Sequence, residues 1–332
     1  MQLLQTLLAA GLLASTAVAH PGGHDVLPSM SDIQRRSGLA KRCAGAVGEM
    51  NRKRWAKRQA KRGLEARAGN ATFEIATEAP YYDVLQNDTC VLAPTVTEGP
   101  YVWPRSQTLR QDMTEGQPGI PMTLDVGVLD MATCEPLENV LMDFWHCNAT
   151  GSYSSFTKLS PNTAFADLLE AMNITDSFEI GVTDLHTDDT TFLRGMWPTD
   201  SNGMMEMKTI VPGFYIQRSI HIHVEAHTDW VLAPNGTISS GNRVSTGQIY
   251  INETLSQQLM ALEPYVSHTQ INRTTNDEDS VFDQDTVGGY NPVIDFVAED
   301  GVDVANGVIG YITIGIDTTD IQTGSISGAP AS

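Results

Sequence analysis

Residues 212–223 read Pro212-Gly213-Phe214-Tyr215-Ile216-Gln217-Arg218-Ser219-Ile220-His221-Ile222-His223. The last four residues alternate between isoleucine and histidine, which is typical of a β-strand with two different faces. Side chains two residues apart on a strand point to the same face, so His221 and His223 can present both imidazoles to one metal ion. The Pro-Gly pair predicts a turn that folds Tyr215 and Arg218 back over this strand. The alternative interpretation of the two histidines is a polar strand face exposed to water.

The chain around this stretch consists of short strand-like segments separated by Gly, Pro, Asn and Asp. Their apolar residues alternate with more polar ones, as half-buried strands require. The predicted strands cover residues 122–128, 140–145, 205–211, 220–226, 248–251 and 308–316. Asp200–Gly203 predicts a hairpin turn, and short helices are predicted after Ser160-Pro161 and from Thr254 to near Pro264. Because no βαβ rhythm is present, the fold class is predicted to be all-β, a sandwich or barrel with a few short helices.

A second segment supplies another candidate ligand. Residues 143–153 read Asp-Phe-Trp-His-Cys-Asn-Ala-Thr-Gly-Ser-Tyr, a strand that ends in a glycine turn before Tyr153. Phenolate oxygen is a hard, anionic ligand that favours ferric iron over softer or divalent ions. Two phenolates, from Tyr153 and Tyr215, and two imidazoles would leave one net positive charge on Fe(III) and an open coordination position.

Together these segments resemble those of the intradiol ring-cleavage dioxygenases, in particular the extracellular fungal branch. The matching pieces are Thr97-Glu98-Gly99-Pro100-Tyr101, Trp145-His146-Cys147-Asn148 with Gly151 and Tyr153, Leu193-Arg194-Gly195, and the 212–223 segment. With the strands between them, they span about residues 90–320. The specific part of the resemblance is the spacing Tyr-x-x-Arg-x-x-His-x-His.

The resemblance implies a β-sandwich in which Tyr153, Tyr215, His221 and His223 bind a non-haem Fe(III) at one side. It also implies that Arg218 holds the bound aromatic ring and stabilises the charge that develops on it. Tyr215 is then expected to leave the metal and take up a proton when substrate binds. The implied reaction is cleavage of a catechol-type ring between its two hydroxyls by O2, which gives a muconate-type diacid.

Several positions beside these motifs need an interpretation of their own. Val102 stands where members of the family often have a tyrosine, and Phe214 where they often have a tryptophan; both are expected to touch the pocket. We interpret His146 as structural, and His227 as a histidine behind the ligands or on the surface. Cleavage after residue 19 would expose His20, a possible copper ligand, but no further histidine pair completes such a site.

Two alternatives stay open from the sequence. A zinc hydrolase or a cupin-like Fe(II) oxygenase would use His221, His223 and Glu225, although Glu225 follows His223 by only two residues and would crowd the same edge. A non-catalytic secreted metal-binding protein would keep the fold and the metal without the reaction.

Residues 1–19 predict a signal peptide, because the apolar run Leu3–Val18 ends in Ala17-Val18-Ala19. Seven Asn-x-Ser/Thr sequons support a secreted glycoprotein: Asn70, Asn87, Asn148, Asn173, Asn235, Asn252 and Asn272. No later apolar stretch approaches twenty residues, so no membrane span is expected in the mature chain. Four cysteines fit an oxidising compartment and allow three pairings. Among these we expect Cys134–Cys147 across a hairpin, with Cys43–Cys90.

The net charge of −20 is unevenly distributed. Residues 20–69 carry twelve Lys/Arg and four Asp/Glu, which predicts a basic helical arm. It is either a propeptide cut at dibasic sites, an arm for an acidic partner, or a solvated helix packed on the body. The dioxygenase-like domain is expected over 70–320, with a loose tail at 321–332.

Residues 70–332 hold eight basic and 36 acidic side chains, a formal charge of −28. This charge repels nucleic acid. It also disfavours a catechol that carries a carboxylate, since holding one would need a second cation near the iron. Arg194 is the only candidate for that cation near the expected ligands. The expected partners are therefore an uncharged aromatic diol and O2.

Overall fold

The computed structural model describes residues 42–43, 45–54, 56–58, 97–103, 108–180, 182–234, 238–239, 242–286 and 291–322. The expected signal peptide, most of the basic arm, Cys90, the end of the tail and three of the sequons (Asn70, Asn87 and Asn235) lie outside these residues. In the described part of the chain, no helix is long and apolar enough to cross a bilayer.

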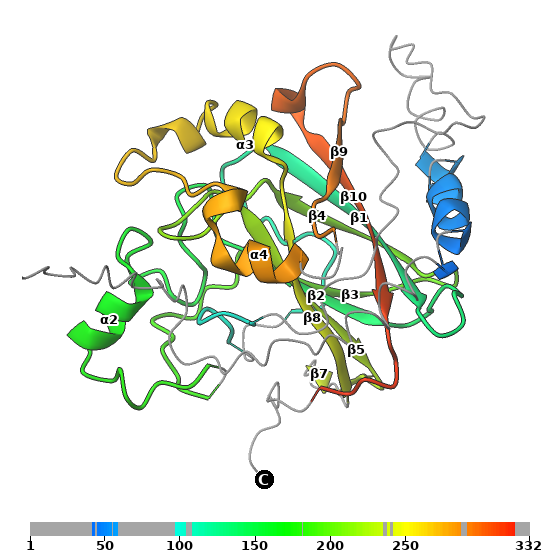
Figure 1. The fold of residues 1–332 in the computed structure, drawn as a ribbon, viewed down its shortest axis with the longest axis horizontal. Helices are drawn as coiled ribbons and strands as arrows, with labels where there is room; N and C mark the ends of the chain where they lie inside the picture. The colour runs from blue at the N-terminus through cyan, green and yellow to red at the C-terminus, as the bar shows by residue number, and fades with distance from the viewer. Residues whose placement is uncertain are drawn as a thin grey trace, which may run out of the picture.

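Two four-stranded sheets form a β-sandwich, which confirms the expected fold class (Figure 1). The first sheet has the order β4 (Met204–Ile210), β1 (Pro121–Asp130), β10 (Val308–Ile316) and β9 (Asp295–Ala298). The second has the order β3 (Arg194–Pro198), β2 (Leu141–Trp145), β5 (His221–Thr228) and β8 (Asn242–Tyr250). A small ribbon pairs β6 (Val231–Leu232) with β7 (Ile238–Ser239). Within the two main sheets all neighbours are antiparallel except β1 and β10.

Strand alternation places one face of each sheet in a shared core. On β1 the inward residues are those expected from the sequence, Met122, Leu124, Val126 and Val128. On β5, Ile222, Val224 and Ala226 point into the same core. The intervening residues of β5 therefore point away from the core, and they include both histidines of the His-x-His pair.

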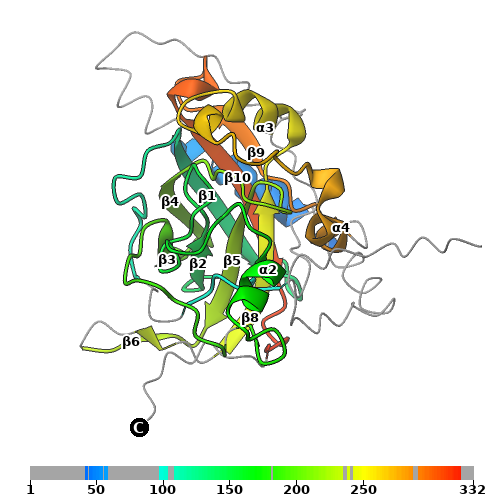
Figure 2. The same ribbon diagram turned by 90° about the vertical axis from the view of Figure 1, so that its left-hand side faces the viewer.

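The helices are short, and their starts differ from the predicted ones. α2 (Phe165–Ala171) follows Ala164 without a side-chain cap, so Ser160 does not begin it. α3 (Glu253–Met260) begins after Asn252, whose side chain accepts from the Leu255 backbone N–H, two residues earlier than Thr254 would allow. α4 (Ser280–Thr286) was not expected and lies against the edge strand β8 (Figure 2). Short 3₁₀ turns cover Tyr265–Ser267, Asn276–Glu278 and Val304–Asn306.

The turn at Asp200–Gly203 is present, but it does not make a hairpin. The Gly203 N–H donates to the Asp200 carbonyl at 2.8 Å, and Gly203 has a φ of 68°, which favours glycine. The strand before the turn, β3, pairs with β2, whereas the strand after it, β4, pairs with β1. The turn therefore carries the chain from one sheet to the other. The local sequence predicts that the chain reverses here, but it does not predict which strand β4 pairs with.

Residues 42–43, 45–54 and 56–58 are helical and pack on the outer face of the first sheet. Asp125 on β1 is buried there and forms ion pairs with Arg54 at 3.2 Å and with Arg58 at 2.8 Å. Gly127 makes room for this helix, because an added Cβ would lie closer than 3.0 Å to Arg54 and Met50. This part of the basic arm is thus a helix docked on the acidic body, and its buried arginines neutralise a buried carboxylate.

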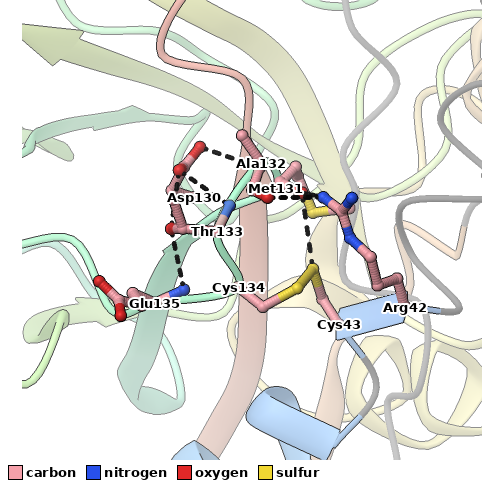
Figure 3. Close-up of a disulfide and its surroundings, with 8 residues drawn as sticks. All are labelled: Arg42, Cys43, Asp130, Met131, Ala132, Thr133, Cys134 and Glu135. Carbon is pink, nitrogen blue, oxygen red and sulfur yellow. Dashed lines mark hydrogen bonds between the residues drawn. A yellow bond between two sulfur atoms is a disulfide. The ribbon is translucent and has the colours of Figure 1, made fainter.

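A disulfide joins Cys43 on this helix to Cys134, just after β1 (Figure 3). Arg42 supports the junction by donating to the Met131 and Ala132 carbonyls at 2.6 and 2.7 Å. Cys147 keeps a free, buried thiol. Both expected pairings, Cys134–Cys147 and Cys43–Cys90, are therefore wrong. Cys134 and Cys147 do not flank a hairpin, because β1 and β2 lie in different sheets.

The long connection between β2 and β3, which includes α2, covers the opposite side of the sandwich from the N-terminal helix (Figure 1). Its aromatic and aliphatic side chains form a second apolar cluster over the outer face of β2 and β5. Tyr101, Tyr153 and Tyr215 belong to this cluster. The outward histidines of β5 are consequently enclosed by tyrosines rather than exposed to water.

Candidate metal centre

The outer face of β5 presents a row of polar side chains from His221 to His227. His221, His223, Glu225 and His227 are all buried, with exposures of 2% or less. The alternation of β5 continues to His227, because the register shift beside it skips a residue of β8 and none of β5. The expectation that His227 lies behind the ligands agrees with this placement, and the alternative of a surface position is wrong.

The two tyrosines reach the histidines from loops that touch through their backbones. Gly151 has a φ of 84°, and an added Cβ would lie closer than 3.0 Å to the Phe214 carbonyl oxygen. Gly213 donates its N–H to the Asn148 carbonyl at 3.2 Å, and a Cβ there would strike Ala149. Only glycine permits both contacts, and they bring Tyr153 and Tyr215 to the same point.

Four donor atoms converge at that point. The Tyr153 hydroxyl lies 3.5 Å from His221 Nε2 and 3.1 Å from His223 Nε2. The Tyr215 hydroxyl lies 3.3 Å from His221 Nε2, and the two Nε2 atoms are 3.2 Å apart. The sequence-derived ligand set is therefore brought together from two loops and one strand.

The neighbours of the histidines fix their orientation. His221 Nδ1 donates to the Ser219 carbonyl at 2.7 Å, which leaves the Nε2 lone pair directed at the tyrosines. The His223 ring stacks on Trp145 with centroids 4.8 Å apart. These are the contacts that commonly hold imidazole ligands in place.

The donor set fits a small, hard cation. Ligand atoms 3.1–3.5 Å apart can all lie about 2 Å from one ion. Burial raises the pKa of Tyr215 to about 12, an effect that the Arg218 charge partly offsets, and burial also raises the pKa of Tyr153 well above its usual value. Without a cation both phenols would stay protonated at neutral pH, so ionised oxygens here require a strong positive charge. Phenolate ligands favour Fe(III).

Arg218 lies beside this centre and is completely buried. Its Nε donates to both oxygens of Asp279, at 3.1 and 3.0 Å. Its Nη2 donates to the Gln248 side-chain oxygen and, at 3.4 Å, to the Tyr250 hydroxyl. Both Gln248 and Tyr250 come from β8, at positions paired with His223 and His221. The chain turns tightly between Tyr215 and Arg218, with Gln217 at a φ of 66°.

The segment 97–103 closes the aromatic cluster from another side. The Thr97 carbonyl accepts from Gln248 at 3.1 Å, and Glu98 pairs with Arg243 of β8. These contacts place the Tyr101 ring in a stack on Tyr153, with centroids 4.6 Å apart. Tyr101 therefore restricts the position of the ring of Tyr153, one of the candidate metal ligands.

Glu225 does not join the four donors. Its carboxylate lies 3.1 Å from Arg243 and 3.2 Å from His227. Asp143, Glu225 and His227 form a buried group whose possible ligand atoms lie within 4.8 Å of one another. Burial, and then the Asp143 charge, raise the pKa of Glu225 well above its usual value. We interpret the group as a charge network around Arg243, and this weakens the alternative of a centre built on Glu225.

Other residues singled out from the sequence have different surroundings. His146 contacts the Thr209 hydroxyl at 2.6 Å and the Cys147 carbonyl at 2.7 Å, and burial lowers its pKa to about 4, which agrees with a structural role. Val102 packs against the aromatic cluster. Phe214, by contrast, is part of the core between the sheets and stacks on His268.

Comparisons with known proteins agree with this fold and these motifs. A family model described as "Dioxygenase" matches residues 97–181. The structure of an intradiol ring-cleavage dioxygenase from Tetranychus urticae aligns with a TM-score of 0.55 and 25% identity, covering 70% of this chain and 98% of that one. The chain is therefore similar in fold and in part of its sequence to an intradiol ring-cleavage dioxygenase. A further dioxygenase crystal structure aligns with a TM-score of 0.54 and 25% identity, over 70% of this chain and 98% of that chain.

A catechol 1,2-dioxygenase from Acinetobacter sp. ADP1 is more distant, with a TM-score of 0.38, 19% identity, and coverage of 69% of this chain and 65% of that chain. No curated protein matches the sequence. The segment matched by the family model contains Tyr153 but ends before Tyr215, Arg218 and the two histidines.

Sequence reasoning missed the residues that hold Arg218. Asp279 and Tyr250 lie outside every quoted motif, and Gln248 was expected only as the start of a strand. Gln248 and Tyr250 have a detectable signal, since they alternate on β8 as His221 and His223 do on β5. Asp279 has no such signal, because it approaches Arg218 from 61 residues away in the sequence.

Proposed function

We propose that this chain is a secreted non-haem Fe(III) dioxygenase that cleaves catechol-type rings between the two hydroxyls. The observation that carries the proposal is the convergence of two tyrosine hydroxyls on two imidazole nitrogens, with hydroxyl-to-nitrogen contacts of 3.1–3.5 Å, beside a buried arginine. Similarity to the intradiol enzymes supports the same reaction. Catechol plus O2 then gives a muconate-type diacid, with both oxygen atoms incorporated.

Tyr153, Tyr215, His221 and His223 would hold the iron. When bound, ferric iron supplies the Lewis acidity and the electron-accepting orbital that make a bound catecholate ring reactive towards O2. The protein encloses this centre in apolar and aromatic side chains, which exclude water. Ser219 and Trp145 keep the imidazoles in position.

Tyr215 is suited to accept a proton from the substrate. Burial raises its pKa to about 12, so a phenolate released at this position would be a strong base at neutral pH. Its hydroxyl contacts His221, and Arg218 lies just beyond the turn that follows it. Arg218 would stabilise negative charge that develops on the ring through its oriented guanidinium N–H groups, which act strongly in a water-excluded site.

The preferred substrates would be uncharged catechols. Arg194, the one other cation considered for a substrate carboxylate, is buried and donates to Ser154 Oγ and O, both at 2.9 Å, and to the Tyr101 carbonyl at 2.7 Å. Its Nε and Nη2 are therefore engaged in structural contacts. The positive charge of Arg218 is balanced by Asp279. A carboxylate-bearing ring would find no uncommitted cation among these groups.

Export and glycosylation remain part of the proposal on sequence grounds, as does a place in the extracellular fungal branch. Among the described sequons, Asn173, Asn252 and Asn272 are exposed, whereas Asn148 is half-buried and its side-chain oxygen accepts from Thr150 and Ser152. The three exposed asparagines are thus better acceptors for a glycan than Asn148.

The test combines three measurements on the purified secreted protein: iron content, visible spectrum and O2 uptake with catechol. We expect one iron per chain, a tyrosinate-to-Fe(III) charge-transfer band, and O2 consumption equal to the catechol consumed. Iron and colour without O2 uptake would instead support the non-catalytic metal-binding alternative. Zinc in place of iron, with no visible band, would overturn the assignment.

A further inference from the structure

We propose that Asp279 is a positioning residue that fixes the orientation of Arg218 and cancels its charge, and thereby makes the site select uncharged catechols. The inference rests on the proposed function, since it concerns how that site chooses its substrate. It assigns a role to a residue between the 3₁₀ turn Asn276–Glu278 and α4 that lies far from every motif of the sequence.

The Asp279 carboxylate is held from several directions. It is fully buried, and both of its oxygens accept from Arg218 Nε. Its Oδ2 also accepts from the Ser219 backbone N–H and hydroxyl, each at 2.9 Å. Its Oδ1 accepts from the Val281 N–H at 3.0 Å, in the first turn of α4. A carboxylate with this many donors has one orientation available, and so does the guanidinium paired with it.

The same carboxylate also connects to the metal ligands. Ser219, which donates to Asp279 twice, accepts from His221 Nδ1 through its carbonyl. Asp279 therefore anchors the backbone that aims His221 while it holds the side chain of Arg218. Displacing this carboxylate would move the Arg218 side chain directly and the His221 imidazole indirectly, through Ser219.

The charged groups around Arg218 leave the Arg218–Asp279 pair with little net charge. Burial opposes ionisation of Asp279, but Arg218 and the bonds from Ser219 and Val281 hold the pKa of its carboxyl below the usual value. Burial raises the pKa of Asp285 well above its usual value, which disfavours a second negative charge beside Arg218. Gln248 and Tyr250, which also accept from Arg218, are uncharged. The pair of Arg218 and Asp279 is thus close to neutral as a unit, and it offers little attraction to a substrate carboxylate.

The test uses Asp279→Asn, which keeps the shape and an acceptor oxygen but removes the charge. We expect iron content to be retained, kcat/KM for catechol to fall about ten-fold or more, and the ratio of protocatechuate to catechol activity to rise about ten-fold. Anaerobic dissociation constants for the two ligands should shift in the same sense. This second readout does not depend on turnover.

Asp125→Asn is the matched control. Asp125 is also a buried aspartate paired with arginine, but it lies under the N-terminal helix on the far side of the sandwich. It should lose stability like Asp279→Asn while the substrate ratio stays at the wild-type value. If Asp279→Asn does not fold, Asp279→Glu takes its place. We expect it to lower kcat/KM for catechol, because the longer side chain displaces Arg218, and to leave the ratio unchanged.

The outcomes separate the two proposals. If the wild-type protein does not consume catechol, the proposed function fails, and the dissociation constants alone then decide the role of Asp279. A second outcome is an active wild-type protein and an Asp279→Asn variant with unchanged protocatechuate-to-catechol ratios, both for kcat/KM and for the dissociation constants. That outcome overturns the selectivity role of Asp279. An unchanged kcat/KM in Asp279→Glu would overturn the positioning role.

Discussion

Gly151 lies against the carbonyl oxygen of Phe214 so closely that any Cβ at Gly151 would come within 3.0 Å of it. This contact joins the loop that carries Tyr153 to the loop that carries Tyr215. Neither tyrosine lies on a regular strand, so their common position depends on this backbone approach. A single methyl group added at Gly151, which is not a ligand, is therefore expected to disturb the metal centre.

We expect Gly151→Ala to lower iron content and to destabilise the fold by about 1–3 kcal/mol, through strain and displacement of the two loops. Gly116→Ala provides the control, because Gly116 also has a positive φ but nothing lies within 4 Å of its Cβ position. Iron analysis and thermal unfolding should separate the two variants. Equal iron content in both would mean that the loop contact does not hold the site together.

The ligand assignment is tested by Tyr153→Phe and His221→Ala. Each removes one of the converging donor atoms, so we expect each to abolish iron retention or activity. His186→Ala is the matched control, since His186 is only partly buried and stacks on Trp103. Normal iron and turnover in either ligand variant would contradict the assignment.

Arg218→Ala should keep iron and colour but lose activity, because the guanidinium acts on the ring and not on the metal. It should also unfold more easily, by about 3–5 kcal/mol, since Asp279 is left as an unpaired buried charge. Adding Asp279→Ala should recover part of that stability without restoring activity. A colourless Arg218→Ala protein would show that Arg218 supports the metal centre itself.

The disulfide between Cys43 and Cys134 ties the N-terminal helix to the body and closes a loop with a sequence separation of 91. We expect Cys134→Ser to lower the free energy of unfolding by about 2–5 kcal/mol while iron content and turnover stay normal. Cys43→Ser and the double variant should cost the same as the single one, because they break the same bond. Denaturant titration of the three variants measures this, and additive losses would argue against the pairing.

How far the sequence predicts this structure can be judged from particular residues. Alternation on Met122–Val128 and on Val308–Ile316 sufficed to find two central strands, because one face of each is apolar. The ligand set could be inferred from two short motifs and a resemblance. The disulfide could not, since it depends on where the N-terminal helix docks. The pairing of Arg218 with Asp279 could not either, because Asp279 reaches it from a distant segment without a local pattern.

Mass analysis of the product formed under ¹⁸O2 tests the central claim most directly. Catechol should give a muconate-type diacid that contains both atoms of one labelled O2, and the wild-type protein should form it in proportion to its iron content. A product with no labelled oxygen, or a ring opened outside the two hydroxyls, would contradict intradiol cleavage at the centre formed by Tyr153, Tyr215, His221 and His223.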